Sequence, residues 1–187
     1  DPGEQCDDGN QGNGDGCSDT CQVEDGWTCT DPTAGGNAVA DGGFEAGTPN
    51  PNWAESSTNF GTPLCDVAGC GTGTGTGPYA GNWWAWFGGI AAYEAGSVSQ
   101  SVTIPASATD MTFELEQIIC DSAADYVEVN IDGNQEFVST GASALCGVLG
   151  YAQQTVDVSA YADGGAHTVE FYSEIFATNG GGSNFFV

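Results

Sequence analysis

The sequence contains no lysine and no arginine among its 187 residues, whereas it has 26 aspartates and glutamates and a formal net charge of −26. Only the single histidine, His167, can offer a carboxylate a cationic side chain. Nucleic acids and anionic membranes bind proteins mainly through Lys and Arg, so both are excluded as partners. Two like charges about 4 Å apart repel by roughly 1 kcal/mol in water, so we expect the fold to need screening salt or bound cations. Calcium is the first candidate because it prefers carboxylate and carbonyl oxygens; a generally acidic protein without specific cation sites is the alternative.

Several common site patterns are also missing. No two cysteines have the C-x-x-C spacing of zinc sites. No apolar run approaches the roughly 18 residues that would indicate a membrane span, so we expect no direct membrane insertion. His167 lies near no nucleophile motif such as G-x-S-x-G. The eight cysteines, an even number, predict four disulfides and therefore an extracellular protein, either secreted or displayed on a cell surface.

Residues 1–31 form a segment too poor in apolar side chains to bury its own core. They contain four of the eight cysteines and only one large apolar side chain, Trp27. Such a segment has to be stabilised by disulfides. Four cysteines permit three connectivities, of which the interpretation favoured here pairs Cys6–Cys21 and Cys17–Cys29.

A run of acidic, amide and glycine residues separates the first two cysteines. Glycines that permit left-handed backbone alternate with side-chain oxygens, so several oxygens can converge on one cation. The spacing is not that of an EF-hand, and a plain Asx/Gly turn is the alternative to a calcium loop. The candidate calcium ligands in this run are Asp7, Asp8, Asn10, Asn13 and Asp15.

The N-terminal segment resembles a known family. The stretch DPGEQCDDGN…GDGCSDTCQVEDGWTC is similar to the myxococcus-type cysteine-rich repeat of bacterial surface proteins, over residues 4–29. The resemblance implies extracellular display and a small disulfide-bonded spacer, and it implies nothing about catalysis. Family members usually carry a further cysteine just upstream, so we expect this chain to be a piece of a longer protein.

Residues 41–187 are predicted to be β throughout, after a small-residue linker over residues 32–40. Apolar and polar side chains alternate with period two along residues 97–104 and 127–131, and Gly, Asn and Asp mark the turns. No helix pattern stands out. Eight to ten short strands predict an all-β fold, a jelly-roll β-sandwich preceded by a small disulfide-stapled, loop-rich module.

This second domain resembles the galactose-binding-like jelly rolls, which include carbohydrate-binding modules and bacterial surface domains. The resemblance rests on DGGFE at residues 41–45, QSVTIP at residues 100–105 and NFFV at residues 184–187. It implies a jelly roll and a structural calcium held in part by Glu45, whose aspartate partner would lie beyond Val187. Many members of this group bind no sugar.

The aromatic run Trp83-Trp84-Ala85-Trp86-Phe87 is a candidate binding feature. In a strand, Trp84 and Trp86 share one face while Trp83 and Phe87 share the other. At least one pair should therefore lie outside the core. It can be covered by the long loop 61–81, form a protein interface, or stack on sugar rings.

The remaining cysteines lie within the β domain. The close spacing of Cys65 and Cys70 predicts a local disulfide at the base of a Gly/Thr-rich loop, and Cys120–Cys146 then follows by elimination. Strand carboxylates could be imagined as a glycosidase pair, but alternation places most of them in solvent, so no enzyme is predicted. These carboxylates are Glu114, Glu116, Glu128, Glu136, Glu170 and Glu174.

The favoured function is a secreted, non-enzymatic surface module for calcium-dependent adhesion or filament-like extracellular assembly, with copies of itself or other surface proteins as partners. The alternative is a carbohydrate-binding module of a larger secreted or cell-surface protein, with glycans as partners; a fragment of a glycan-active enzyme is a third, weaker possibility. Residues 185–187 have strand character, and the nearest proline is Pro105. Edge strands are usually protected by Lys or Pro, which are absent here. We therefore expect this strand either to continue in the parent protein or to complete a sheet edge next to another subunit, and a monomeric spacer is the alternative to assembly.

Overall fold

The computed structural model describes residues 38–187, which form one compact unit. The predicted pairs Cys6–Cys21 and Cys17–Cys29 and the five calcium ligands between Asp7 and Asp15 lie outside the described residues. Within the described part, no helix is long and apolar enough to cross a membrane.

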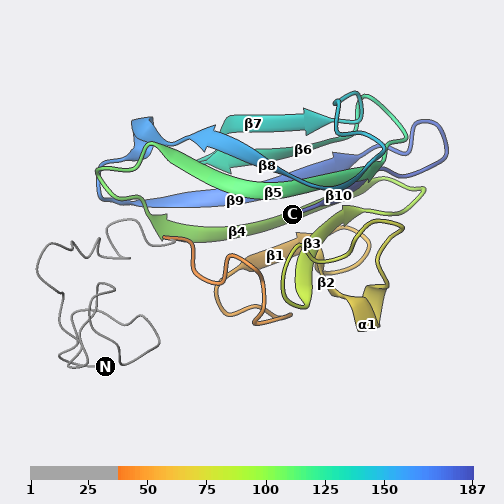
Figure 1. Cartoon of the computed structure of the whole chain (residues 1–187), viewed down its shortest axis with the longest axis horizontal. Coiled ribbons are helices and arrows are strands. Elements are labelled where there is room, and N and C mark those ends of the chain that lie inside the picture. The colour runs from red at the N-terminus through yellow and green to blue at the C-terminus, as the bar shows by residue number, and fades with distance from the viewer. Residues whose placement is uncertain (1–37) are drawn as a thin grey trace, which may run out of the picture. The chain divides into compact units, whose positions relative to one another are not determined.

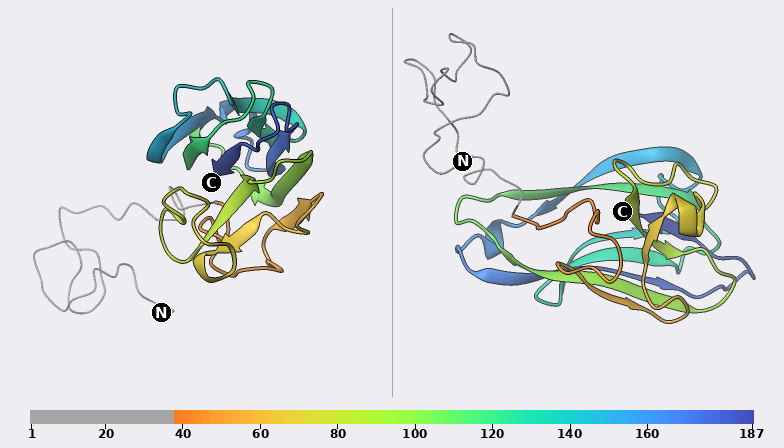
Figure 2. Two further views of the ribbon diagram at one scale, coloured as in Figure 1. Left: turned by 90° about the vertical axis from the view of Figure 1, so that its right-hand side faces the viewer. Right: turned by 90° about the horizontal axis from the view of Figure 1, so that it is seen from below.

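Residues 38–187 fold into ten strands arranged as two antiparallel sheets (Figures 1 and 2). Sheet A has the order β1-β4-β9-β6-β7 and sheet B the order β2-β3-β10-β5-β8. The strands of sheet A are β1 (Ala54–Ser57), β4 (Glu94–Thr103), β9 (Ala166–Ile175), β6 (Tyr126–Ile131) and β7 (Asn134–Thr140). Those of sheet B are β2 (Leu64–Asp66), β3 (Trp83–Gly88), β10 (Asn184–Phe186), β5 (Asp110–Ile119) and β8 (Val148–Asp157). The helices are the short α1 (Val67–Cys70) and a 3-10 turn, Ser159–Tyr161. The predicted jelly-roll β-sandwich is confirmed.

The core lies between the two sheets and follows the predicted alternation. On β4, Val98 and Val102 are buried while Ser101 and Thr103 are exposed. Sheet B contributes Leu115 and Phe185, both fully buried, to the same cluster. Period-two burial of this kind is what one inward face and one outward face of each strand require.

The C-terminal strand β10 is an interior strand, so the expectation that residues 185–187 complete a sheet edge next to another subunit is wrong. Phe185 pairs with Phe87 of β3 on one side, and Phe186 pairs with Glu116 of β5 on the other. Both backbone edges of the strand are thereby used by its own sheet. The free sheet edges belong to β1, β7, β2 and β8.

Two disulfides lie in the described part, Cys65–Cys70 and Cys120–Cys146, which are the pairs predicted for this domain. The last residues of the predicted linker rest on the sandwich. Val39 packs against the core, and the side chain of Gln100 both accepts a hydrogen bond from the Ala40 N–H and donates one to the Ala40 carbonyl, each at 2.8 Å.

Candidate functional site

The aromatic strand β3 is divided between the core and a covered outer cluster. Phe87 and Trp83 face the core between the sheets. Trp84 and Trp86 lie on the outer face of sheet B, with ring centroids 6.4 Å apart and planes 16° apart. Phe186 of β10 packs edge-on against both indoles.

The loop Gly71–Gly77 covers this outer cluster. A Cβ at Gly73 would lie 2.7 Å from Trp86, and one at Gly75 would collide with Phe186, so glycine permits the close approach of backbone to rings. Trp84 is consequently only 2% exposed. Of the three alternatives for this aromatic run, the structure shows coverage by the loop, and the cluster offers no open platform.

Glu116 holds the loop in place. Its carboxylate accepts hydrogen bonds from the Thr76 N–H at 3.0 Å, the Thr76 hydroxyl at 2.6 Å and the Gly150 N–H at 2.8 Å. Glu116 is fully buried, so the expectation that it would be solvated is wrong. Alternation placed it correctly on the outer face of the sheet, but the loop that covers that face could not be read from the strand pattern.

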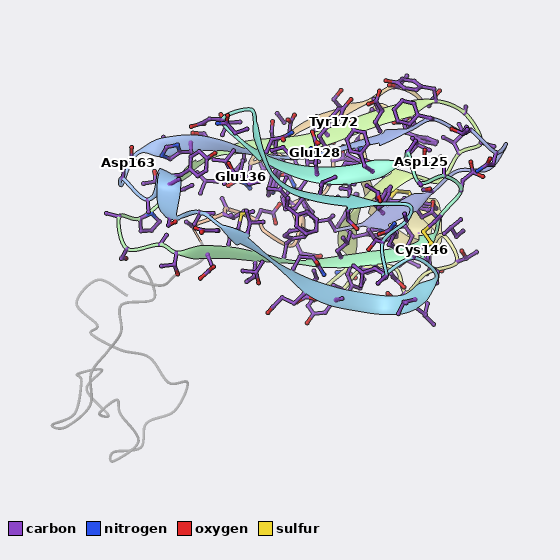
Figure 3. All side chains as sticks on the ribbon, turned by 90° about the horizontal axis from the view of Figure 1, so that it is seen from above. Asp125, Glu128, Glu136, Cys146, Asp163 and Tyr172 are labelled. Carbon is purple, nitrogen blue, oxygen red and sulfur yellow. A yellow bond between two sulfur atoms is a disulfide. The ribbon has the colours of Figure 1, made fainter. Side chains whose placement is uncertain are left out.

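The outer face of sheet A presents a different set of side chains, which we call the tyrosine–glutamate face. Strand register places Tyr172 of β9 opposite Glu128 of β6 (Figure 3). It also places Glu170 opposite Asn130. In the next row, Glu174 lies opposite Tyr126. The tyrosine–glutamate face comprises Tyr93, Tyr126, Tyr172, Glu128, Glu170, Glu174, Asn130 and Gln135.

Two tyrosine hydroxyls fix the Glu174 carboxylate at one end of this face. Tyr93 donates to it at 2.6 Å and Tyr126 at 2.7 Å. The hydrogen bond to Glu174 raises the pKa of Tyr93 to about 12, and burial together with the same carboxylate raises the pKa of Tyr126. Burial and the nearby charge of Glu174 also raise the pKa of Tyr172. All three phenols therefore stay neutral at physiological pH, with aromatic rings and hydroxyl donors retained.

Side-chain amides organise the other carboxylates of the face. Asn130 donates to Glu128 at 3.0 Å and lies 3.4 Å from Glu170, while Gln135 of β7 also donates to Glu128. The rings of Tyr126 and Tyr172 lie 6.2 Å apart at 50°. Aromatic faces thus alternate with fixed carboxylate and amide groups across two neighbouring strands.

The adjoining part of the same face is made of small side chains. Tyr172 lies opposite Ser97 of β4, and Glu170 lies opposite Ser99. Beyond β4, the edge strand β1 continues the rows with Ser56 and Ala54. These small residues present little side-chain bulk beside Tyr172, so a ligand lying across β4 can approach that ring from the side.

Carboxylates elsewhere in the domain are satisfied by N–H and O–H donors. Glu45, the predicted calcium ligand, accepts from the N–H groups of Asn82 and Trp83 at 2.8 and 2.9 Å, and this lowers the pKa of its carboxyl. Glu94 accepts from the loop that follows β1, and the buried Asp125 accepts from the Ser183 hydroxyl. Among residues 38–187, no three His, Cys, Asp or Glu side chains are grouped as metal ligands. The calcium assignment therefore stays a prediction.

The sequence contains a signal for the tyrosine–glutamate face. Tyr126 lies two residues before Glu128, and Tyr172 lies two residues from both Glu170 and Glu174, so period two places each tyrosine on the same face as its glutamates. What the sequence lacked was the strand order that brings β6 and β9 side by side.

Neither a protein-family model nor a curated protein matches the sequence. Among solved structures, the chain is similar to the carbohydrate-binding module TmCBM61, determined in complex with β-1,4-galactotriose. The match has a TM-score of 0.54 and 15% sequence identity, and it covers 80% of this chain and 93% of that chain. At this level of identity the similarity establishes the β-sandwich fold alone.

Proposed function

We propose that residues 41–187 form a carbohydrate-binding module and that the tyrosine–glutamate face is its binding site. The observation that carries the proposal is the combination on one outer sheet face of three neutral tyrosine rings with carboxylates and amides held by hydrogen bonds. Sugar rings present C–H faces that pack on aromatic rings, and hydroxyls that both donate and accept. The fold shared with a carbohydrate-binding module supports the same function.

The ligand class follows from the charges on the face. Three glutamates surround the tyrosines, the whole chain carries −26, and it has no Lys or Arg to bind an anion. Uronate-containing or sulfated glycans would be repelled, whereas the hydroxyls of a neutral glycan can donate to the carboxylates. The proposed ligand is therefore a neutral polysaccharide, bound without catalysis.

Such a module would attach a larger extracellular protein to a polysaccharide surface. The two disulfides support an oxidising compartment, where they persist. Adhesion is thus the consequence of glycan binding in this proposal. Calcium dependence is a separate prediction, because the hydrogen bonds of the face need no metal ion.

Isothermal titration of the full chain against neutral oligosaccharides, beginning with β-1,4-galactooligosaccharides, tests the proposal. Tyr172→Ala should weaken binding by about tenfold or more, because truncating a central hot-spot tyrosine costs about 2 kcal/mol or more and about 1.4 kcal/mol is tenfold. Tyr79→Ala is the matched control, since Tyr79 is 63% exposed and packs on Tyr151, away from sheet A. Equal losses in the two variants, or no binding to any neutral glycan, would contradict the proposal.

A further inference from the structure

Strand β8 is the longest free edge of the sandwich. It runs over ten residues, Val148–Asp157, and pairs along one side only, with β5. The other free edges are shorter: β2 has three residues, β1 has four and β7 has seven. Shortening an edge strand and bulging it are two ways in which proteins prevent further pairing. β8 is not shortened, and its register shift opposite Glu116 leaves Ala152–Asp157 as a regular edge.

The chemistry of β8 also favours pairing. From Val148 to Val156 the strand has no charged side chain and no proline, the two residue types that usually blunt an edge. Val148 is 50% exposed and Leu149 is 64% exposed, at the start of the strand. One side-chain bond, from Gln154 Nε2 to the Ala152 carbonyl at 3.0 Å, satisfies a backbone acceptor in the monomer, and a pairing strand would replace it.

We propose that β8 pairs antiparallel with β8 of a second copy, so that sheet B continues across a two-fold axis. A strand paired with its own copy in this way forms an isologous, closed interface. Main-chain hydrogen bonds would supply affinity, and the exposed pair Val148 and Leu149 would bury apolar surface.

The charge distribution identifies the occupant as a second copy. Two chains that each carry a net charge of −26 repel each other wherever their carboxylates meet. Strand β8 has no carboxylate side chain of its own before Asp157, so it is the contact at which this repulsion is smallest. On the neighbouring strand β5, Glu114 lies opposite Gln153, and the buried Glu116 carboxylate accepts the Gly150 N–H of β8 at 2.8 Å. Across the new pair, the two copies of strand β5 would be three strand spacings apart, about 14 Å, which exceeds the Debye length of about 8 Å at physiological salt. A basic partner would instead prefer the carboxylate-rich faces.

This pairing is independent of glycan binding. The tyrosine–glutamate face belongs to sheet A, whereas β8 is the outermost strand of sheet B, so the dimer would present two free glycan-binding faces. Two linked sites raise avidity for a polymer without any new contact to it.

Sedimentation equilibrium of the full chain, over a range of concentrations and NaCl, tests the interface. The expected result is a monomer–dimer equilibrium that tightens as salt screens the two chains. Leu149→Glu should weaken the dimer by about tenfold or more, because it places like charges in a desolvated contact. Thr103→Glu adds the same charge at an exposed position of β4 and should have a much smaller effect. A strict monomer at every concentration, or equal effects of the two substitutions, would overturn the proposal.

Hydrogen exchange of the unmodified chain provides a second test that does not depend on any variant. The β8 amides should become more protected as concentration rises, while those of the edge strands β1 and β7 should not. Concentration-dependent protection at β1 or β7 instead would place the interface elsewhere. Protection of the free β8 edge at every concentration would mean that another segment of the same chain covers it, and would likewise overturn the proposal.

Discussion

At the scale of single residues, the side chain of His167 bridges two carboxylates at one end of sheet A. Its Nδ1 lies 2.8 Å from Asp132 and its Nε2 lies 3.1 Å from Asp163, while Tyr161 packs edge-on against the ring. The hydrogen bonds to Asp132 and Asp163 raise the pKa of His167 above its ordinary 6.5. The bond from His167 lowers the pKa of Asp132, and the Gly165 N–H followed by His167 lowers that of Asp163.

Replacing His167 with Gln should destabilise the domain only in a defined pH window. A raised histidine pKa contributes stability below the unfolded value of 6.5 that is lost as pH rises through the folded pKa. The lowered pKa values of Asp132 and Asp163 contribute stability above pH 3.8, and this stability is lost as pH falls through their folded pKa values. The drop in Tm for His167→Gln should therefore be largest between these values and should shrink above neutral pH. A drop of equal size at pH 5 and pH 9 in thermal unfolding would contradict this assignment.

At the scale of structural elements, the loop Gly71–Gly77 is fixed by a few bonds from the sheet that it covers. Glu116 receives the Thr76 N–H and hydroxyl, Asn184 donates to the Gly73 carbonyl at 3.1 Å, and Tyr151 donates to the Gly77 carbonyl at 2.7 Å. Because the Glu116 carboxylate is buried, each of its hydrogen bonds to the loop should stabilise the fold more than an exposed hydrogen bond would.

Thr76→Val removes one donor to Glu116 and preserves side-chain volume, so it should lower the free energy of unfolding by about 1–2 kcal/mol. Because the loop covers Trp84 and Trp86, acrylamide should quench the fluorescence of the variant more than that of the unmodified chain. Thr72→Val, in the same loop, is the matched control, since Glu116 bonds to Thr76. If the control loses as much stability as Thr76→Val, the bond to Glu116 is not what holds the loop.

The same elements show how far sequence patterns reach. Alternation along residues 97–104 and 127–131 predicted the inward and outward faces of β4 and β6 correctly, because side-chain direction in a strand is a local property. It could not place β10 between β3 and β5, because strand order depends on the packing of the whole chain. For the same reason, period two put Glu116 on the outer face but could not show that a loop buries it.

At the scale of the whole molecule, only one side chain, His167, can offset the net charge of −26. The buried carboxylates Glu94, Glu116 and Asp125 receive N–H or O–H donors, which satisfy their oxygens but leave their charge in place. The sequence predicted the shortage of cationic partners, and it could not show that backbone N–H groups would satisfy the oxygens of the buried carboxylates. The remaining repulsion is long-ranged and is reduced only by salt or by bound cations.

Calcium and sodium should therefore act on this chain in distinguishable ways. Raising NaCl should raise the Tm of the full chain, because screening weakens repulsion more in the compact state than in the extended one. Calcium at matched ionic strength should raise the Tm further, and in a saturable way, only if oxygen ligands converge on the ion, as predicted for Asp7–Asp15.

Isothermal titration should then show calcium binding that is lost in the double variant Asp7→Asn/Asp15→Asn. Binding should persist in Glu45→Gln, because the Glu45 carboxylate is occupied by the N–H groups of Asn82 and Trp83. Calcium binding that survives the double variant and disappears in Glu45→Gln would place the calcium site in the jelly roll. A titration without any heat of binding would mean that salt screening alone reduces the repulsion between carboxylates.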